Sequence, residues 1–289
     1  MSALKAAAPY YPPGVRPLAS IYASMTRPIR LLGHMLSFLG RAIVGIPAMF
    51  RHYTREFLRI LSDVTWGNGS LVVGGGTAGV ILVLGASAGA IVGIEGYNAL
   101  RMLGLGQATG LISASASTRE LAPIMAALAF ASQAGCRFTA QLGAMRITEE
   151  IDAMETLAIR SIPYLVTTRL VASIVAVIPL FVMCLVLSYV VVQGVVALAG
   201  GVSIGTYQHY FHLVMAGPDI IYSVIKAVVF VSITTTIQCY YGYYARGGPQ
   251  GVGVAVGRAM RLGISAMIVV NLLLTLAFWG VSSGSRLGG

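Results

Sequence analysis

The chain has 289 residues, of which 57% are hydrophobic and 10% are charged, and its mean hydropathy is +0.83. A soluble domain has about 25% charged residues, so this composition excludes an ordinary soluble fold and predicts an integral membrane protein. The net charge is +10, but the basic residues follow membrane topology and do not gather in one patch. No nucleic-acid partner is therefore expected.

Residues 1–24 are rich in proline and alanine and are predicted to form a disordered cytoplasmic tail. They contain no compact positive segment followed by an apolar core and a cleavage site, so a signal peptide is not expected. Residues 25–63 interleave arginines with large apolar side chains. This pattern is typical of a basic amphipathic helix at the inner membrane surface, which Pro47 is expected to interrupt. A pair of soluble helices that packs on a partner is the alternative.

Five stretches are long and apolar enough to cross a membrane, because a spanning helix needs about 20 mostly apolar residues. The predicted spans cover approximately residues 68–95, 120–143, 164–196, 219–245 and 260–284. The predicted fold is an all-α integral membrane protein with five transmembrane helices and an interfacial helix before them.

The first predicted span is rich in glycine. Gly85, Gly89 and Gly93 are spaced four apart and form a smooth stripe that lets another helix approach closely. The stretch GGGTAG at 74–79 formally matches the dinucleotide-binding pattern, but that pattern needs a preceding strand and a βαβ unit. Helix packing, and not nucleotide binding, is predicted for these glycines.

Ionisable residues at membrane depth are costly, so each is a candidate for a functional site. Glu95 ends the first predicted span, and Arg119 with Glu120 opens the second. They could cap helix ends, pair with each other or extend to the headgroups, or they could line a polar mouth or ligand pocket. Arg137 and Lys226 lie within spans and have no acidic partner within reach in the sequence.

Lysine and arginine orient the chain, because cytoplasmic loops are enriched in them. If the N-terminus is inside, the inner segments 1–66, 137–169 and 246–261 hold 15 of the 19 basic residues. Five spans then place the C-terminus outside. The expected location is the plasma (inner) membrane, with a multi-pass topology.

Residues 145–163 concentrate acid between two predicted spans, on the predicted inner side. Four of the nine acidic residues lie within seven positions: Glu149, Glu150, Asp152 and Glu155. At about 100° per residue, a helix gathers an apolar arc, made of Ile147, Ile151, Met154 and Ala158. Thr148 is the predicted N-cap of this helix, and Pro163 limits its continuation.

The acidic rim of this predicted helix, residues 146–160, gains nothing from an anionic inner leaflet. A groove on a cytoplasmic protein would accommodate both the apolar ridge and the acids. A docking helix is therefore predicted, and a merely solvated loop helix is the alternative.

The sequence offers no catalytic set, such as a nucleophile with a base or a metal cluster. His209 and His212 lie three apart on a predicted outer loop without nearby acids or cysteines, so interfacial packing is the favoured interpretation. The P-loop pattern is absent, and neither Lys5 nor Lys226 follows glycines at its spacing. No catalytic residue, metal or cofactor is expected in this chain. The cysteines lack paired spacing and are expected to be buried thiols: Cys136, Cys184 and Cys239.

Four motifs occur in an order that resembles the MlaE/YrbE family of ABC-transporter permeases, the membrane subunits of Mla and Mce lipid-transport systems. They are RELAP at 119–123, AQLGAMRITEEIDAMETLAI at 140–159, YLVTTRLVA at 164–172 and GGPQGVGVAVGRAMR at 247–261. The stretch CYYGYYARGGPQGVG from Cys239 looks most like the actinobacterial Mce-associated branch, as a B-type permease. Two different permeases commonly pair in that branch.

The resemblance implies an MlaE-type permease domain over residues 64–289 and a coupling helix that docks on an ATPase. The coupling residues would be Thr148, Glu149, Glu150, Ile151, Asp152, Met154 and Glu155. A lipid pocket between two permeases would lie near Arg119, Glu120, Glu95 and Tyr97. The implied partners are a cytoplasmic ABC ATPase dimer that carries ATP and Mg, a paralogous second permease in a heterodimer, outer Mce-domain proteins and a lipid.

The chain departs from the family where many members carry charges, having Ser132-Gln133 and Gln141, while Arg137 is an additional charge. This suggests that the second permease differs and supplies the missing charges. The expected function is an ATP-driven permease that moves lipids between the inner membrane and an outer Mce-protein tunnel. The alternatives are an ATP-independent secondary transporter and a membrane scaffold for Mce-protein assembly.

Overall fold

The computed structural model describes residues 16–66, 76–215 and 217–280, and every regular element in these ranges is helical. The chain divides into two compact units, residues 1–41 and 42–289. The first unit holds most of α1 (Arg16–Val44). The predicted disordered tail lies partly outside the described residues, and its residues 16–24 belong to α1.

The second unit starts with the end of α1 and two short helices, α2 (Ile46–His52) and α3 (Thr54–Trp66). α2 carries Pro47 in its first turn, where the missing N–H of proline removes no helical hydrogen bond. The preceding helix ends at Val44, so the break expected near Pro47 is present.

Among the described residues, five helical runs are long and apolar enough to cross a membrane. They are α4 (Gly76–Met102), a second run over Gly106–Ile147, a third run over Ile162–Gly200, α11 (Gly217–Tyr243) and α12 (Gly248–Trp279). A sixth would be counted only if Arg30–Val44 and Ile46–His52 formed one broken span. The predicted all-α membrane fold with five spans is confirmed.

The second and third runs are built from several segments. The second contains η2 (Gly106–Ala108), α5 (Thr109–Ile112), η3 (Ser113–Leu121), α6 (Ala122–Phe130), η4 (Ala131–Gly135) and α7 (Cys136–Ile147). The third contains η5 (Ile162–Thr167) and α9 (Thr168–Gly200). The segments η3, η4 and η5 are π-helical, so their wider turns alter the usual pattern of backbone hydrogen bonds.

Side chains of α11 bind backbone carbonyls of these π-helical segments or close to them. The hydrogen bonds run from Ser223 Oγ to Thr118 O at 2.7 Å, from Lys226 Nζ to Arg119 O at 2.6 Å and from Gln238 Nε2 to Ala131 O at 2.8 Å. Carbonyls inside a membrane need protein donors because water is absent there. These bonds fix α11 to the second run along much of its length.

α4 approaches α9 closely at the glycine stripe. A Cβ added to Gly85 would lie 2.8 Å from Cys184 Sγ, and one added to Gly89 would lie 2.7 Å from the carbonyl oxygen of Ser188. Gly93 faces α9 in the same way, at Val195. Because these distances leave no room for a side chain, this approach of the two helices depends on glycine.

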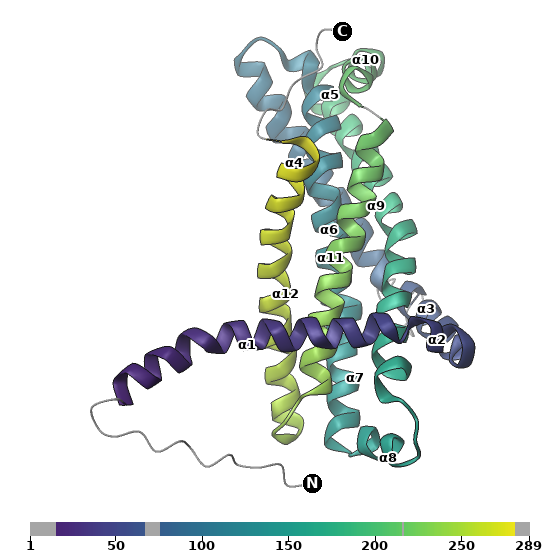
Figure 1. Ribbon diagram of the computed structural model, residues 1–289. Coiled ribbons are helices and arrows are strands. Elements are labelled where there is room, and N and C mark those ends of the chain that lie inside the picture. Colours follow the sequence, from purple (N-terminus) through teal and green to yellow (C-terminus); the bar gives the residue numbers. More distant parts are fainter. Residues whose placement is uncertain (1–15, 67–75, 216, 281–289) are drawn as a thin grey trace. The chain divides into compact units, whose positions relative to one another are not determined.

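Figure 1 shows α4, α9, α11 and α12 running alongside one another, with α8 (Glu150–Thr156) at one end of the bundle and α10 (Ile204–Val214) at the other. We refer to these as the α8 end and the α10 end. Residues 95–120 and 197–219, which lie between predicted spans on the predicted outer side, are mostly helical. The fifth span was predicted to begin near residue 260, but α12 begins at Gly248. The helix extends beyond its apolar part and includes the exposed Arg258 and Arg261.

Candidate functional site

Arg119 and Glu120 lie in η3, well inside the second run, and each pairs with an oppositely charged residue of α11. Arg119 Nη2 is 3.0 Å from Asp219 Oδ2, and Lys226 Nζ is 3.1 Å from Glu120 Oε1. The Lys226 side chain is fully buried, whereas that of Glu120 is 34% exposed. Because Asp219 lies in the first turn of α11, the two pairs join these helices near the α10 end.

α12 completes this constellation with three hydrogen bonds to the carboxylates. They run from Trp279 Nε1 to Asp219 Oδ1 at 2.9 Å, from Asn271 Nδ2 to Glu120 Oε2 at 2.7 Å and from Thr275 Oγ1 to Glu120 Oε1 at 2.7 Å. The guanidinium of Arg119 and the ammonium of Lys226 lie 5.3 and 5.4 Å from the centroid of the Trp279 ring, within cation–π range. We call this set the ion cluster: Arg119, Glu120, Asp219, Lys226, Asn271, Thr275 and Trp279.

The ion cluster balances two cationic side chains with two carboxylates inside the membrane-spanning part of the chain. Charges at this depth persist only when they are paired and hydrogen-bonded or face a polar cavity. Since Glu120 is paired but still partly exposed, its carboxylate can accept a hydrogen bond from a further donor. The geometry suits binding of a polar group and does not resemble a nucleophile activated by a base.

One expectation about these charges is wrong. Arg119 and Glu120 do not open the second span, because partners on α11 and α12 stabilise their charges and the helical run starts at Gly106. Lys226, which has no acidic partner nearby in the sequence, pairs in the fold with Glu120, 106 positions away. Asp219, Asn271, Thr275 and Trp279 were missed, and the only signal was that a buried lysine requires a counter-charge.

Arg137 also has an acidic partner that sequence reasoning missed. Arg137 Nη1 lies 3.6 Å from Asp63 Oδ1, and Arg137 Nη2 donates to the carbonyl of Asp63 at 2.9 Å. This contact connects α7 to α3. Gln141 accepts a hydrogen bond from the buried Arg169 at 3.3 Å.

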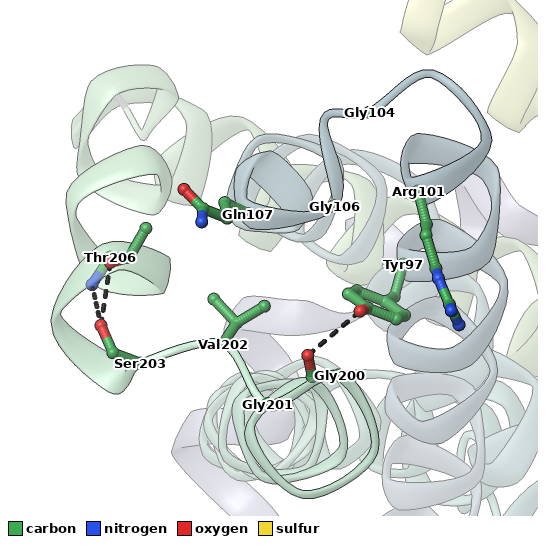
Figure 2. Close-up of a pocket in the computed structure, with 10 residues that line it drawn as sticks. All are labelled: Tyr97, Arg101, Gly104, Gly106, Gln107, Gly200, Gly201, Val202, Ser203 and Thr206. Carbon is green, nitrogen blue, oxygen red and sulfur yellow. Dashed lines mark hydrogen bonds between the residues drawn. The ribbon is translucent and has the colours of Figure 1, made fainter.

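Tyr97 belongs to a different place, a pocket of about 460 Å³ at the α10 end. It is lined by Tyr97, Arg101, Gly104, Gly106, Gln107, Gly200, Gly201, Val202, Ser203 and Thr206. Figure 2 shows the Tyr97 hydroxyl turned to the carbonyl of Gly200, to which it donates at 3.0 Å. Arg101 extends along α4, away from Gln107 and Thr206. Glu95 is exposed on α4 and does not line this pocket.

The wall of this pocket is held by packing and by α10. A Cβ at Gly200 would lie 2.7 Å from the Tyr97 ring, so only glycine lets the ring lie there. Tyr207 of α10 donates to Ser113 Oγ at 2.7 Å. Burial raises the pKa of this phenol, and the hydrogen bond to Ser113 acts in the opposite direction. Of the four predicted lipid-pocket residues, the structure therefore brings together only Arg119 and Glu120.

The α8 end carries the predicted docking helix in a shorter form. α8 covers Glu150–Thr156, not 146–160, because α7 continues to Ile147 before the chain turns. Thr148 is not the N-cap: its hydroxyl donates to the carbonyl of Ala144 and to Glu150 Oε1, both at 3.0 Å. Glu149 and Ala158, on either side of α8, have left-handed φ angles of 61° and 60°, which is unusual for residues other than glycine.

The predicted coupling residues do not all face the same way. Ile151 is fully buried, so the expected apolar ridge packs largely on the protein itself, while Met154 is half-buried. Asp152 pairs with Arg146 at 2.5 Å. Glu149 and Glu150 remain exposed, and Leu157, which sequence reasoning did not select, is 73% exposed. The accessible surface at α8 is therefore acidic, with an apolar side chain at its edge.

Glu155 is exposed, but one of its carboxylate oxygens bonds to two buried hydroxyls. Its Oε1 accepts hydrogen bonds from Ser161 Oγ at 2.6 Å and from the Tyr243 hydroxyl at 3.0 Å, and these two hydroxyls lie 2.8 Å apart. Among the described residues, no group of three His, Cys, Asp or Glu side chains is placed to hold a metal ion. The three cysteines are free thiols, with Cys184 and Cys239 buried and Cys136 half-buried.

Comparison with known proteins identifies the family. The family model described as "Permease MlaE" matches residues 67–277. The chain belongs to the MlaE permease family. The matched residues include the ion cluster up to Thr275, the pocket and α8, whereas α1 to α3 precede them.

Relatives of this MlaE-family permease include proteins described as transporter permeases. A probable ABC transporter permease of Rickettsia bellii is 31% identical over 67% of this chain and 74% of its own length. The intermembrane phospholipid transport system permease MlaE of Haemophilus influenzae is 26% identical over 87% and 93%. The chloroplastic protein TRIGALACTOSYLDIACYLGLYCEROL 1 of Arabidopsis thaliana is 29% identical over 70% and 57%. This chain is a lipid-transport permease subunit with several membrane spans.

Proposed function

We propose that this MlaE-family permease is the membrane half of an ATP-driven transporter that moves hydrophobic lipids between the inner membrane and an outer tunnel of Mce-domain proteins. The observation that carries the proposal is the difference between the side chains exposed at the two ends of the bundle. The α8 end exposes Glu149, Glu150 and Leu157. The ion cluster lies toward the opposite end and leaves Glu120 partly exposed at membrane depth.

ATP hydrolysis is assigned to a separate cytoplasmic ABC ATPase dimer that supplies both ATP and Mg. The sequence lacks the P-loop pattern, and the relatives described as ABC transporter permeases support such a partner. The exposed acids at α8 suit a basic groove on that ATPase. We propose Glu149 and Glu150 as its main polar contacts and Leu157 as an apolar one.

The proposed orientation places the N-terminus and α8 in the cytoplasm and the C-terminus outside the plasma (inner) membrane. The excess of basic residues in the segments 1–66, 137–169 and 246–261 supports this orientation. The α10 end then meets the Mce-domain proteins. α12 leaves large apolar side chains exposed, such as Ile268 and Leu272, which suits contact with lipid or with a paralogous second permease.

In this proposal, lipid binds where the exposed face of Glu120 meets the apolar walls of the spans. Closure of the ATPase dimer on nucleotide pushes α8, rearranges the spans around Glu120 and expels the lipid. The ion cluster holds two cationic and two anionic side chains, so it suits a headgroup that both accepts and donates hydrogen bonds.

A secondary transporter is the alternative with a specific observation in its favour. Ion pairs within the spans are what a proton or ion relay requires, and Lys226 with Glu120 forms such a pair. The relatives described as ABC permeases favour the ATP-driven reading. A scaffold for Mce-protein assembly would require neither α8 nor the ion cluster.

The proposed docking is tested by purifying the tagged full chain in mild detergent and identifying the proteins that accompany it. The wild type is expected to retain an ABC ATPase, and Glu149→Lys/Glu150→Lys is expected to lose it. The matched control Glu149→Asp/Glu150→Asp keeps the charges and should retain the ATPase. Retention of the ATPase by the lysine variant would refute the docking contact, and absence of any ATPase from the wild type would refute the ABC function.

A further inference from the structure

The C-terminal end of α8 is joined to α11 by a compact hydrogen-bonded group. It consists of Glu155, Ser161 and Tyr243, and we call it the inner hub. Both hydroxyls bond to the same carboxylate oxygen, at 2.6 and 3.0 Å. Ser161 and Tyr243 are 4% and 8% exposed. Hydrogen bonds to an ionised carboxylate are roughly twice as strong as neutral ones, and here both donor hydroxyls are buried while the accepting Glu155 is exposed.

The three residues of the inner hub come from three different segments of the chain. Glu155 lies near the end of α8, Ser161 immediately precedes the third run, and Tyr243 is the last residue of α11. A displacement of α8 must therefore either move α11 or break these bonds. Glu155 is exposed like Glu149 and Glu150, but it differs from them because its carboxylate bonds to Ser161 and to Tyr243 of α11.

α11 extends from the inner hub to the ion cluster. Lys226 and Asp219 lie 17 and 24 positions before Tyr243, which corresponds to about 26 and 36 Å along a helix. The hydrogen bonds from Ser223 and Gln238 to the second run hold α11 in register between these points. A shift of α11 at the inner hub would consequently change the geometry of both ion pairs.

The connections of α8 to the neighbouring helices suit a movable element. Glu149 and Ala158 hold left-handed backbone angles on either side of it, and such strained positions often occur in segments that switch conformation. α8 can then move as a short unit between two bends, while the inner hub provides its link to α11.

We propose that the inner hub transmits the displacement of α8 to α11 and from there to the ion cluster, so that Glu155 and Tyr243 are positioning residues for lipid transport and not contacts of the ATPase. This inference rests on the proposed ATP-driven function. It predicts that breaking the hub separates ATP hydrolysis from lipid movement without releasing the ATPase.

The test uses the full transporter, with its ATPase and outer partners, reconstituted in phospholipid vesicles. Transfer of a fluorescent phospholipid and ATP hydrolysis are measured together, and their ratio gives the ATP consumed per lipid. Tyr243→Phe removes only the hydroxyl that bonds to Glu155. Tyr241→Phe is the matched control, because it makes the same change two positions earlier at a hydroxyl with no hydrogen bond among the described residues.

Tyr243→Phe is expected to raise the ATP consumed per lipid by about tenfold, the scale of one charge-assisted hydrogen bond, with the ATPase still bound. Tyr241→Phe should leave the ratio unchanged. Ser161→Ala provides a second variant if Tyr243→Phe does not fold, and it should raise the ratio in the same direction. Glu155→Gln keeps an acceptor oxygen and should have a smaller effect.

Two results would overturn the inference. An unchanged ratio in Tyr243→Phe or Ser161→Ala, even with a lowered melting temperature, would make the hub merely structural. Loss of the ATPase from these variants would make the hub part of the docking surface. Failure of the proposed function itself looks different, because the wild-type complex would then show no ATP-dependent transfer at all.

Discussion

At the scale of single residues, the buried ammonium of Lys226 depends on the carboxylate of Glu120. Lys226→Met would leave Glu120 without its cation; such losses cost about 3–5 kcal/mol in fully buried pairs, and the cost here should be lower because Glu120 is 34% exposed. Adding Glu120→Gln removes the uncompensated charge and should restore most of that stability. Thermal unfolding of the purified protein in detergent measures both variants. A double variant no more stable than Lys226→Met alone would contradict the pairing.

The backbone around α8 provides a second residue-scale prediction. Ala158 has a φ angle of 60°, a conformation that costs an L-residue roughly 1–2 kcal/mol. Ala158→Gly should therefore be neutral or stabilising by up to about 1 kcal/mol after the extra chain entropy of glycine is included.

Ala153→Gly is the matched control for that prediction, because Ala153 lies within α8. Glycine in a helix interior costs about 1 kcal/mol, so the control should lower the melting temperature. Equal losses in the two variants would mean that Ala158 is not strained.

At the scale of whole helices, the close approach of α4 and α9 depends on Gly89. Gly89→Ala would place a Cβ 2.7 Å from a backbone oxygen of Ser188, and such overpacking typically costs 1–3 kcal/mol, roughly. Gly194→Ala is the control, because Gly194 on α9 has open space around its Cα. Melting temperatures should fall for Gly89→Ala and hold or rise for Gly194→Ala. The reverse order would contradict this helix contact.

The helices themselves were predictable because hydropathy is a local property of the sequence. The five spans and the break at Pro47 follow from composition and from proline geometry. The span boundary at Arg119 was misplaced because its partner Asp219 lies 100 positions away. Sequence patterns show which residues need a counter-charge, but only folding shows where that counter-charge comes from.

The docking helix also shows that sequence patterns do not reveal contacts made by folding. Helical periodicity located the acidic stretch but treated Ile151 as part of a partner surface, whereas folding buries it completely. Periodicity also grouped Glu155 with the other acids. Its actual partners, Ser161 and Tyr243, are 6 and 88 positions away, and the second of these is not detectable from a helical pattern.

At the scale of the whole molecule, the central claim is that the two ends of one bundle perform different tasks. The α8 end would receive movement from an ATPase, and the ion cluster would release a lipid. α11 contributes to both ends through Tyr243 and Lys226. Between these ends, Ser223 and Gln238 of α11 bond to carbonyls of the second run.

The most direct test of this claim is lipid transfer by the reconstituted transporter under two energy sources. We predict that transfer of a fluorescent phospholipid requires hydrolysable ATP and is abolished in Glu149→Lys/Glu150→Lys. A proton or sodium gradient should not change the rate of transfer. Transfer that proceeds without ATP and follows an ion gradient would contradict the account and establish a secondary transporter in its place.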